Sequence, residues 1–116
     1  MAKIVYSPEA KDDMVGIKSY IENDLLNPSA SERVLIRIAK KIRLLETAPQ
    51  IGTPLSSVIP LDTNYRFLVA GNYMAFYRYM ENDNTCYVDR VLYCKRNYIS
   101  ILFGEISDQD EKTDDE

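Results

Sequence analysis

The fold is decided by the stretch YRFLVAGNYMAFYRYMENDNTCYVDRVLYC, residues 65–94. Three runs in it are rich in tyrosine, valine and phenylalanine, which favour strands: 65–69, 73–80 and 85–94. They are separated by Ala70-Gly71-Asn72 and by Glu81-Asn82-Asp83-Asn84. Both separators are typical of hairpin connections, so the stretch predicts an antiparallel meander of three strands.

Alternation along a strand predicts which side chains share a face of the sheet. In the last run, one face is expected to carry Cys86, Val88, Arg90, Leu92 and Cys94. The two cysteines then lie about 26 Å apart, at roughly 3.3 Å per residue, which is far beyond disulfide reach. Reduced thiols that are mostly buried are therefore expected.

Upstream of the meander, the pattern is a short strand followed by two helices. Lys3-Ile4-Val5-Tyr6 is apolar and β-branched, which favours a strand. Ser7-Pro8 and Asn27-Pro28 each combine a capping side chain with a proline at the first helical position. Apolar residues recur at helical spacing after each signal, and the second helix is expected to end near Ala48. Residues 50–63 predict an extended loop.

The element order is therefore β-α-α-β-β-β, an α+β fold with a helical hairpin packed on one face of a small antiparallel sheet. After the meander, Asn97–Phe103 fits either a last turn of helix or a short extended segment. One domain is expected over residues 1–104, followed by an acidic tail at 105–116.

The charge of the chain is divided between these two parts. Residues 1–104 hold 13 Lys+Arg and 11 Asp+Glu, a net of +2, whereas the whole chain has a net charge of −4. The tail holds seven acidic residues and one lysine. Blocks of like charge usually stay disordered, so residues 105–116 are expected to form a disordered, solvated tail. The alternative is that the tail shields the basic surface of its own domain.

Several kinds of site are excluded or not expected. The chain has no histidine, so it has no Ser-His-Asp or Cys-His arrangement. Its four glycines are scattered and form no phosphate-binding loop. The adjacent Asp12 and Asp13 are expected to be solvated, and no metal site or cofactor is expected. No apolar stretch approaches the roughly 20 residues of a membrane span and no signal peptide is evident, so a cytoplasmic protein is expected.

Two basic features remain as candidates for function. The first is a set of four basic side chains on one face of the second helix: Arg33, Arg37, Lys40 and Lys41. It is either a solvated helix face or a surface for nucleic acid or an acidic protein. The second is a set of five basic residues in the part of the chain from Tyr65 onward, which also holds seven of the nine tyrosines. These cations are Arg66, Arg78, Arg90, Lys95 and Arg96. Tyrosine with arginine suits RNA contact or a protein interface, although tyrosine is also simply a good strand residue.

In order and spacing, these motifs resemble the RelE/ParE toxins of bacterial type II toxin–antitoxin systems, over residues 3–103. The resemblance is carried by Tyr6-Ser7-Pro8-Glu9-Ala10, Asn27-Pro28, Gly52-Thr53-Pro54-Leu55, Gly71-Asn72-Tyr73, Arg90-Val91-Leu92-Tyr93 and Lys95-Arg96-Asn97-Tyr98. It implies the same α+β fold and a growth-inhibiting toxin, of the kind linked to plasmid stabilisation, held inactive by a cognate antitoxin.

The resemblance leaves the target open. ParE-like members poison DNA gyrase by binding, whereas RelE-like members cleave mRNA at the ribosome. A third possibility is a non-toxic member that only forms complexes. We expect the gyrase-binding class, because nuclease members usually carry an arginine directly after the tyrosine that opens the middle strand, and here Met74 follows Tyr73.

The resemblance also assigns roles to particular residues. If the protein is a nuclease, Arg96, Tyr98 and Arg66 match family positions that are basic or aromatic, and these are the expected catalytic residues. The expected contacts to a nucleic acid or a protein target are Arg78, Arg90, Lys95, Arg33, Arg37, Lys40 and Lys41.

Overall fold

The computed structural model describes residues 1–104, and the predicted acidic tail lies outside the described residues. Strand β1 spans Lys3–Tyr6 and helix α1 spans Pro8–Ser19, followed by a π-helical turn at Tyr20–Asp24. Helix α2 spans Pro28–Arg43 and continues as a 3-10 turn to Glu46. Ser7 Oγ accepts a hydrogen bond from Ala10 N at 2.9 Å, and Asn27 Oδ1 accepts one from Ala30 N at 3.3 Å. Both predicted helix starts are confirmed.

The predicted meander is confirmed, and it forms the middle of a five-stranded sheet in the order β1-β5-β4-β3-β2. Its strands are β3 (Arg66–Ala70), β4 (Tyr73–Met80) and β5 (Thr85–Tyr93), all antiparallel to their meander neighbours. Gly71, with φ of 61°, allows the tight turn between β3 and β4.

The sheet is mixed, because β1 pairs with β5 in the parallel sense. A parallel pair needs a long crossover, and the chain between these strands provides it with the helical hairpin and the meander. At the opposite edge lies β2 (Thr53–Pro54), inside the predicted loop, which pairs only with Arg66 and Phe67.

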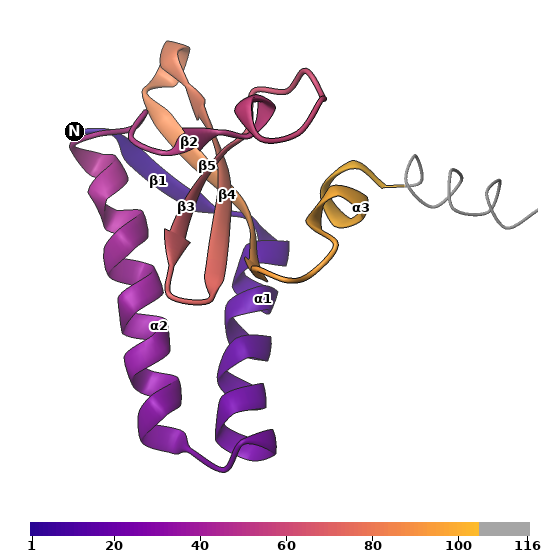
Figure 1. Cartoon of the computed structure of the whole chain (residues 1–116). Coiled ribbons are helices and arrows are strands. Elements are labelled where there is room, and N and C mark those ends of the chain that lie inside the picture. Colours follow the sequence, from indigo (N-terminus) through magenta and orange to yellow (C-terminus); the bar gives the residue numbers. More distant parts are fainter. Residues whose placement is uncertain (105–116) are drawn as a thin grey trace, which may run out of the picture.

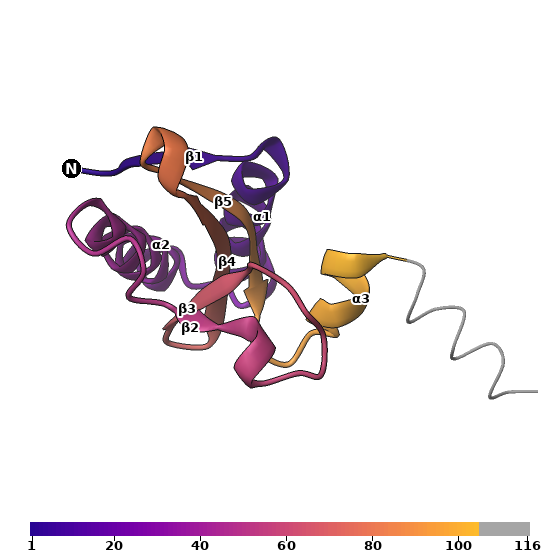
Figure 2. The ribbon, with the colours of Figure 1, turned by 90° about the horizontal axis from the view of Figure 1, so that it is seen from above.

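Figures 1 and 2 show the sheet between two layers: α1 and α2 lie on one face, and α3 (Tyr98–Phe103) lies on the other. The core on the helical-hairpin side includes Ile38, Ile42, Leu45, Tyr77 and Val88. The core on the α3 side includes Leu55, Met74, Phe76 and Leu92, against which Tyr98 and Phe103 pack. The α+β architecture with a helical hairpin on a small sheet is confirmed. No helix among residues 1–104 is long and apolar enough to cross a bilayer.

A β-bulge in β5 changes which side chains share a face. Phe76 is opposite Arg90, but Tyr77 is opposite Val88, so Asp89 is the extra residue. Cys86 and Val88 therefore pack with Val91 on the helical-hairpin side, whereas Leu92 packs on the α3 side. The prediction of one unbroken alternation from Cys86 to Cys94 is wrong. An inserted residue moves every later side chain of the strand to the opposite face of the sheet.

Candidate functional site

The arginine of β3 holds the loop that precedes the sheet. Arg66 Nη1 donates hydrogen bonds to the carbonyl oxygens of Gly52 at 2.8 Å and Gln50 at 3.2 Å. The same loop is fixed by Tyr77, whose hydroxyl accepts from Gly52 N and donates to Pro49 O, both at 2.9 Å. A Cβ on Gly52 would lie 2.7 Å from the Tyr77 ring, so the close approach requires glycine. Arg66 thus contacts backbone carbonyls next to the core.

The arginine of β4 is paired with the bulge residue of β5. Arg78 Nε lies 2.8 Å from Asp89 Oδ2, and Arg78 Nη2 lies 3.4 Å from Asp89 Oδ1. The guanidinium also lies over the Tyr87 ring, 5.8 Å from its centroid. Burial and a hydrogen bond to Asp89 raise the pKa of Tyr65 to about 12. Asp89 therefore organises both Arg78 and Tyr65.

The arginine of β5 fixes helix α1 to the sheet. Arg90 Nε and Nη2 each donate to a different oxygen of Asp13 at 2.8 Å, and Val91 N also donates to Asp13 at 2.9 Å. The Asp13 side chain is only 12% exposed. Hydrogen bonding to Asp13 raises the pKa of the Arg90 guanidinium. The expectation that Asp13 is solvated is wrong, because the bulge brings the Arg90 side chain and a backbone N–H toward it.

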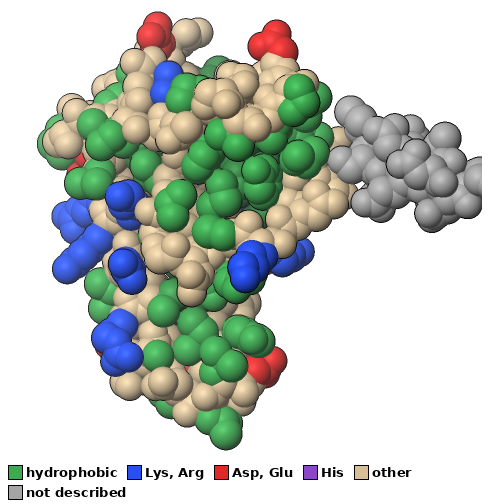
Figure 3. All heavy atoms as spheres, in the orientation of Figure 1, with side chains coloured by type: hydrophobic (Ala, Val, Ile, Leu, Met, Phe, Trp, Pro, Cys, Tyr) green, Lys and Arg blue, Asp and Glu red, His purple; other side chains and the backbone are tan. Residues whose placement is uncertain are grey.

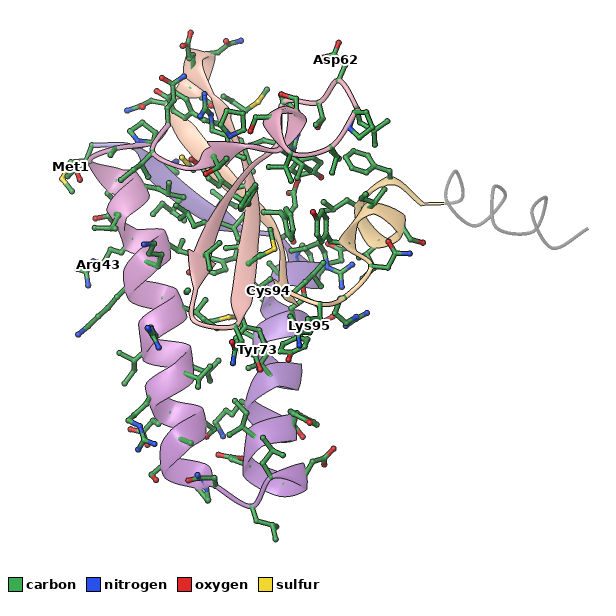
Figure 4. The ribbon with its side chains drawn as sticks, in the orientation of Figure 1. Met1, Arg43, Asp62, Tyr73, Cys94 and Lys95 are labelled. Atoms are coloured by element: carbon green, nitrogen blue, oxygen red, sulfur yellow. The ribbon has the colours of Figure 1, made fainter. Side chains whose placement is uncertain are left out.

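Two of the predicted cations lie in the turn between β5 and α3. Lys95 and Arg96 are exposed, and no ion pair is formed by either within residues 1–104. The turn is closed by a hydrogen bond from Arg96 N to Tyr93 O at 2.9 Å. Figure 4 places Lys95 at the end of the sheet, beside Cys94 and Tyr73. Cys94 N donates to Asn72 O at 2.8 Å, which holds this turn next to the β3–β4 turn.

Three tyrosines lie at the same end of the sheet. The rings of Tyr73 and Tyr93 are 5.8 Å apart in an edge-to-face arrangement. Burial, followed by the proximity of Tyr20 and Tyr93, raises the pKa of Tyr73. Tyr20 is 50% exposed and Tyr93 is 42% exposed, and here the helical hairpin extends beyond the sheet (Figure 1). We call the residues that gather here the sheet-end surface: Tyr20, Tyr73, Tyr93, Lys95 and Arg96.

Tyr98 joins α3 to the sheet and does not project freely. Asn97 Oδ1 accepts from Ser100 N at 3.3 Å and starts α3. The Tyr98 ring then lies 5.2 Å from the Phe76 ring, in the core on the α3 side. Arg96 and Tyr98 are thus neighbours at the start of α3, whereas Arg66 contacts a loop on the other side of β4.

The four cations of α2 form a separate basic surface, the α2 patch: Arg33, Arg37, Lys40 and Lys41. All four are exposed, and Arg37, Lys40 and Lys41 line a groove of about 350 Å³ with Leu44 and the 69–71 segment. Figure 3 shows the Lys and Arg side chains along α2 well apart from those beside α3. The structure therefore does not gather the predicted basic residues into one site.

The two cysteines are free, as expected. Cys86 is completely buried, and burial raises the pKa of its thiol to about 11. No group of three or more potential metal-ligating side chains occurs within the described part of the chain.

The sheet-end surface was only partly predictable. Its cations and two of its tyrosines stand in the basic, tyrosine-rich stretch. Tyr20, the first residue of the π-helical turn after α1, was missed because only the packing of the helical hairpin on the sheet brings it near Tyr73. Exposed tyrosine rings next to an exposed arginine are typical of binding surfaces, because tyrosine and arginine are both enriched where proteins meet.

One protein-family model matches most of the chain. Residues 4–98 match the model of the ParE toxin of type II toxin–antitoxin systems, parDE. A search of curated proteins finds no significant sequence match.

Solved structures resemble the chain at low sequence identity. The chromosomal ParDE toxin–antitoxin system from P. aeruginosa aligns with a TM-score of 0.67 at 16% identity, covering 82% of this chain and 98% of that one. A RelBE toxin–antitoxin complex from Mycobacterium tuberculosis gives 0.57 at 16% identity, covering 79% and 96%. The isolated RelE toxin of E. coli gives 0.54 at 13% identity, covering 91% and 99%. At these identities the structures support the fold.

Proposed function

The chain belongs to the ParE toxin family of type II toxin–antitoxin systems, and we propose that it inhibits growth by binding DNA gyrase and is neutralised by a cognate antitoxin. The choice of gyrase as the target rests on the hydrogen bonds that the three meander arginines form within the protein. Arg66, Arg78 and Arg90 each have a protein partner at 2.8 Å.

Cleavage of RNA places different demands on a site. It needs a group that activates the ribose 2′-hydroxyl and free cations that stabilise the developing phosphate charge. Here the three meander arginines are used for folding, and the position of the usual nuclease arginine holds Met74, which is 8% exposed. These features support a toxin that acts by binding.

The sheet-end surface is the proposed binding surface. It combines exposed tyrosine rings with two cations that form no ion pair in the described part of the chain, and it continues onto the helical hairpin. Because structures that share this fold include toxin–antitoxin complexes, we propose that an antitoxin binds this chain and covers its sheet and hairpin surface. Apolar contact with tyrosine, together with charge pairing to Lys95 and Arg96, fits an acidic, amphipathic partner segment.

A supercoiling assay with purified gyrase tests the proposed target. The protein should inhibit supercoiling of relaxed plasmid in a concentration-dependent manner, and equimolar antitoxin should restore it. Full supercoiling at a large excess of the protein would contradict gyrase as the target.

One observation favours a second function, ribosome-dependent mRNA cleavage. Arg96 is exposed and forms no ion pair within residues 1–104, and Tyr98 follows two residues later. By the resemblance, these are the positions of a basic and an aromatic residue in RelE-like nucleases. Primer extension on cellular mRNA after induction would then show cuts at fixed codon positions. Unchanged growth after induction without antitoxin would instead identify a non-toxic, complex-forming member.

A further inference from the structure

The outer edge of strand β3 is open over its second half. Strand β4 pairs with the whole of β3, whereas β2 pairs only with Arg66 and Phe67. Leu55 N donates to Tyr65 O on the β2 side, and backbone groups point to alternate sides along an antiparallel strand. The N–H and C=O of Val69 therefore point to the β2 side as well, beyond the end of β2. In the described part of the chain, no strand pairs with Val69 on this side.

The α2 patch lies beside this open edge. Three of its cations line the groove of about 350 Å³ that the 69–71 segment borders on the other side. The β3–β4 turn places one of them, because a Cβ on Gly71 would lie 3.4 Å from Arg37 Nη1. No cation of the α2 patch forms an ion pair within residues 1–104. The groove therefore combines uncompensated positive charge with backbone groups that are free to pair with another strand.

The two faces of the sheet differ at this edge. Leu68 and Ala70 pack in the core on the helical-hairpin side, and Phe67 packs on the α3 side. Alternation places Val69 on the α3 side too, where it is 48% exposed. Helix α2 lies on the opposite face (Figure 2). A strand added to this edge would thus turn every second residue toward the cations of α2, which suits acidic side chains, and the others toward the Val69 side, which suits apolar ones.

The spacing of the cations matches such a strand. Arg37 and Lys41 are one helical turn apart, about 6 Å along the axis at 1.5 Å per residue. Alternate residues of a strand are about 6.6 Å apart at 3.3 Å per residue, and α2 runs alongside β3 (Figure 1). A DNA backbone would also contact the cations, but it would leave the half-exposed Leu44 and Val69 and the free Val69 C=O without a partner. The surface therefore favours a peptide over a nucleic acid.

We propose that the groove between α2 and β3 binds an extended segment of a partner protein, in which acidic and apolar residues alternate, as an added strand at the open β3 edge. Hydrogen bonds to the Val69 backbone fix the register, and the acidic side chains pair with Arg37, Lys40 and Lys41. Exposed ion pairs are individually weak and are screened by salt, so affinity falls as salt rises. The site shares no residue with the sheet-end surface, and it does not depend on gyrase as the target.

Titration of the ¹⁵N-labelled full chain with a capped VEVEVE peptide, followed by NMR, tests the proposal. The amide signals of Val69 and Gly71 should shift. At saturation, hydrogen exchange at Val69 N–H should slow by at least about fivefold, because this donor gains an acceptor. A VVVEEE peptide has the same composition and charge but no alternation, and it should bind at least about threefold more weakly, since it cannot place its acids toward α2 and its apolar residues toward Val69.

Two variants locate the charge contact. K40Q/K41Q should weaken binding of the alternating peptide by at least about threefold, which is modest because exposed ion pairs contribute little each. K11Q/K18Q removes two charges from α1 as the matched control and should bind like the wild type.

Four results would each overturn the proposal: equal affinity for the two peptides, equal affinity of the two variants, unchanged exchange at Val69, or shifts confined to the surroundings of Tyr73 and Lys95. Tighter binding of a short DNA duplex at the α2 patch would overturn it in favour of a nucleic-acid surface. None of these measurements involves gyrase, so this proposal and the proposed target can fail separately.

Discussion

The arginines within the sheet and the cations just after it have similar chemistry but opposite surroundings. Arg78 and Arg90 form two-point contacts with Asp89 and Asp13, and their side chains are 35% and 26% exposed. Lys95 and Arg96 follow within a few residues and are exposed without an ion pair in the described part of the chain. A cation of this region therefore serves the fold where the chain fixes an acceptor opposite it, as for Arg78 and Arg90, and can contact a partner where the described residues provide none.

The largest expected effect follows from breaking the Arg90–Asp13 pair. Replacing Asp13 with Ala leaves a partly buried guanidinium and the Val91 N–H without their acceptor. The free energy of unfolding should fall by about 2–3 kcal/mol, as measured by urea denaturation. Lys95→Ala is the control from the other region and should change stability by less than about 0.5 kcal/mol. Equal effects of the two substitutions would remove the distinction between the regions.

A smaller loss is expected from Tyr77→Phe. This change keeps the ring in the core but removes the hydroxyl that links Gly52 N and Pro49 O. The expected loss is about 1–2 kcal/mol, because a buried N–H and a carbonyl lose their partner. Thermal unfolding followed by circular dichroism measures it. No loss would show that the loop before the sheet does not depend on this hydroxyl.

Substitutions in the turn before α3 should separate binding from stability. Arg96→Ala should leave the free energy of unfolding within about 0.5 kcal/mol of the parent, yet weaken growth inhibition. Tyr98→Ala removes a ring that packs on Phe76, so its effect on toxicity would mix folding with binding. Tyr98→Phe preserves this packing and tests the hydroxyl alone. Undiminished killing by Arg96→Ala would exclude this side chain from the working surface.

The last expected effect is a loss of stability at alkaline pH caused by Tyr65. Burial and Asp89 raise the pKa of Tyr65 from 10.0 to about 12 in the folded state. The folded protein therefore holds this proton more tightly than the unfolded chain does, and the associated stability is complete below pH 10. It should be lost as the pH rises from 10 towards 12. Tyr65→Phe should flatten this part of the stability profile, and an unchanged profile would contradict the assigned surroundings of the hydroxyl.

Much of the fold could be predicted because its signals are local. Ser7-Pro8 and Asn27-Pro28 start helices through their own side chains, and Gly71 permits the β3–β4 turn through its backbone conformation. The resemblance to RelE/ParE toxins, stated from ordered short motifs, is confirmed by the family match over residues 4–98.

The parts that were not predicted depend on contacts between distant residues. The bulge at Asp89 arises from the pairing of two strands, and no residue type in β5 marks it. The Asp13–Arg90 pair joins residues 77 positions apart. Strand β2 has only two residues and exists through its pairing with Arg66 and Phe67. The roles assigned to Arg96, Tyr98 and the α2 patch remain predictions, because they concern a partner.

The role of Lys95 and Arg96 is tested most directly by titrating purified gyrase with the wild-type protein and with a K95A/R96A variant in one supercoiling assay. We predict inhibition by the wild type and a shift of the inhibition curve to at least about tenfold higher concentration for the variant, equivalent to about 1.4 kcal/mol of binding free energy. Identical curves for the two proteins would show that Lys95 and Arg96 are not part of the surface that inhibits gyrase.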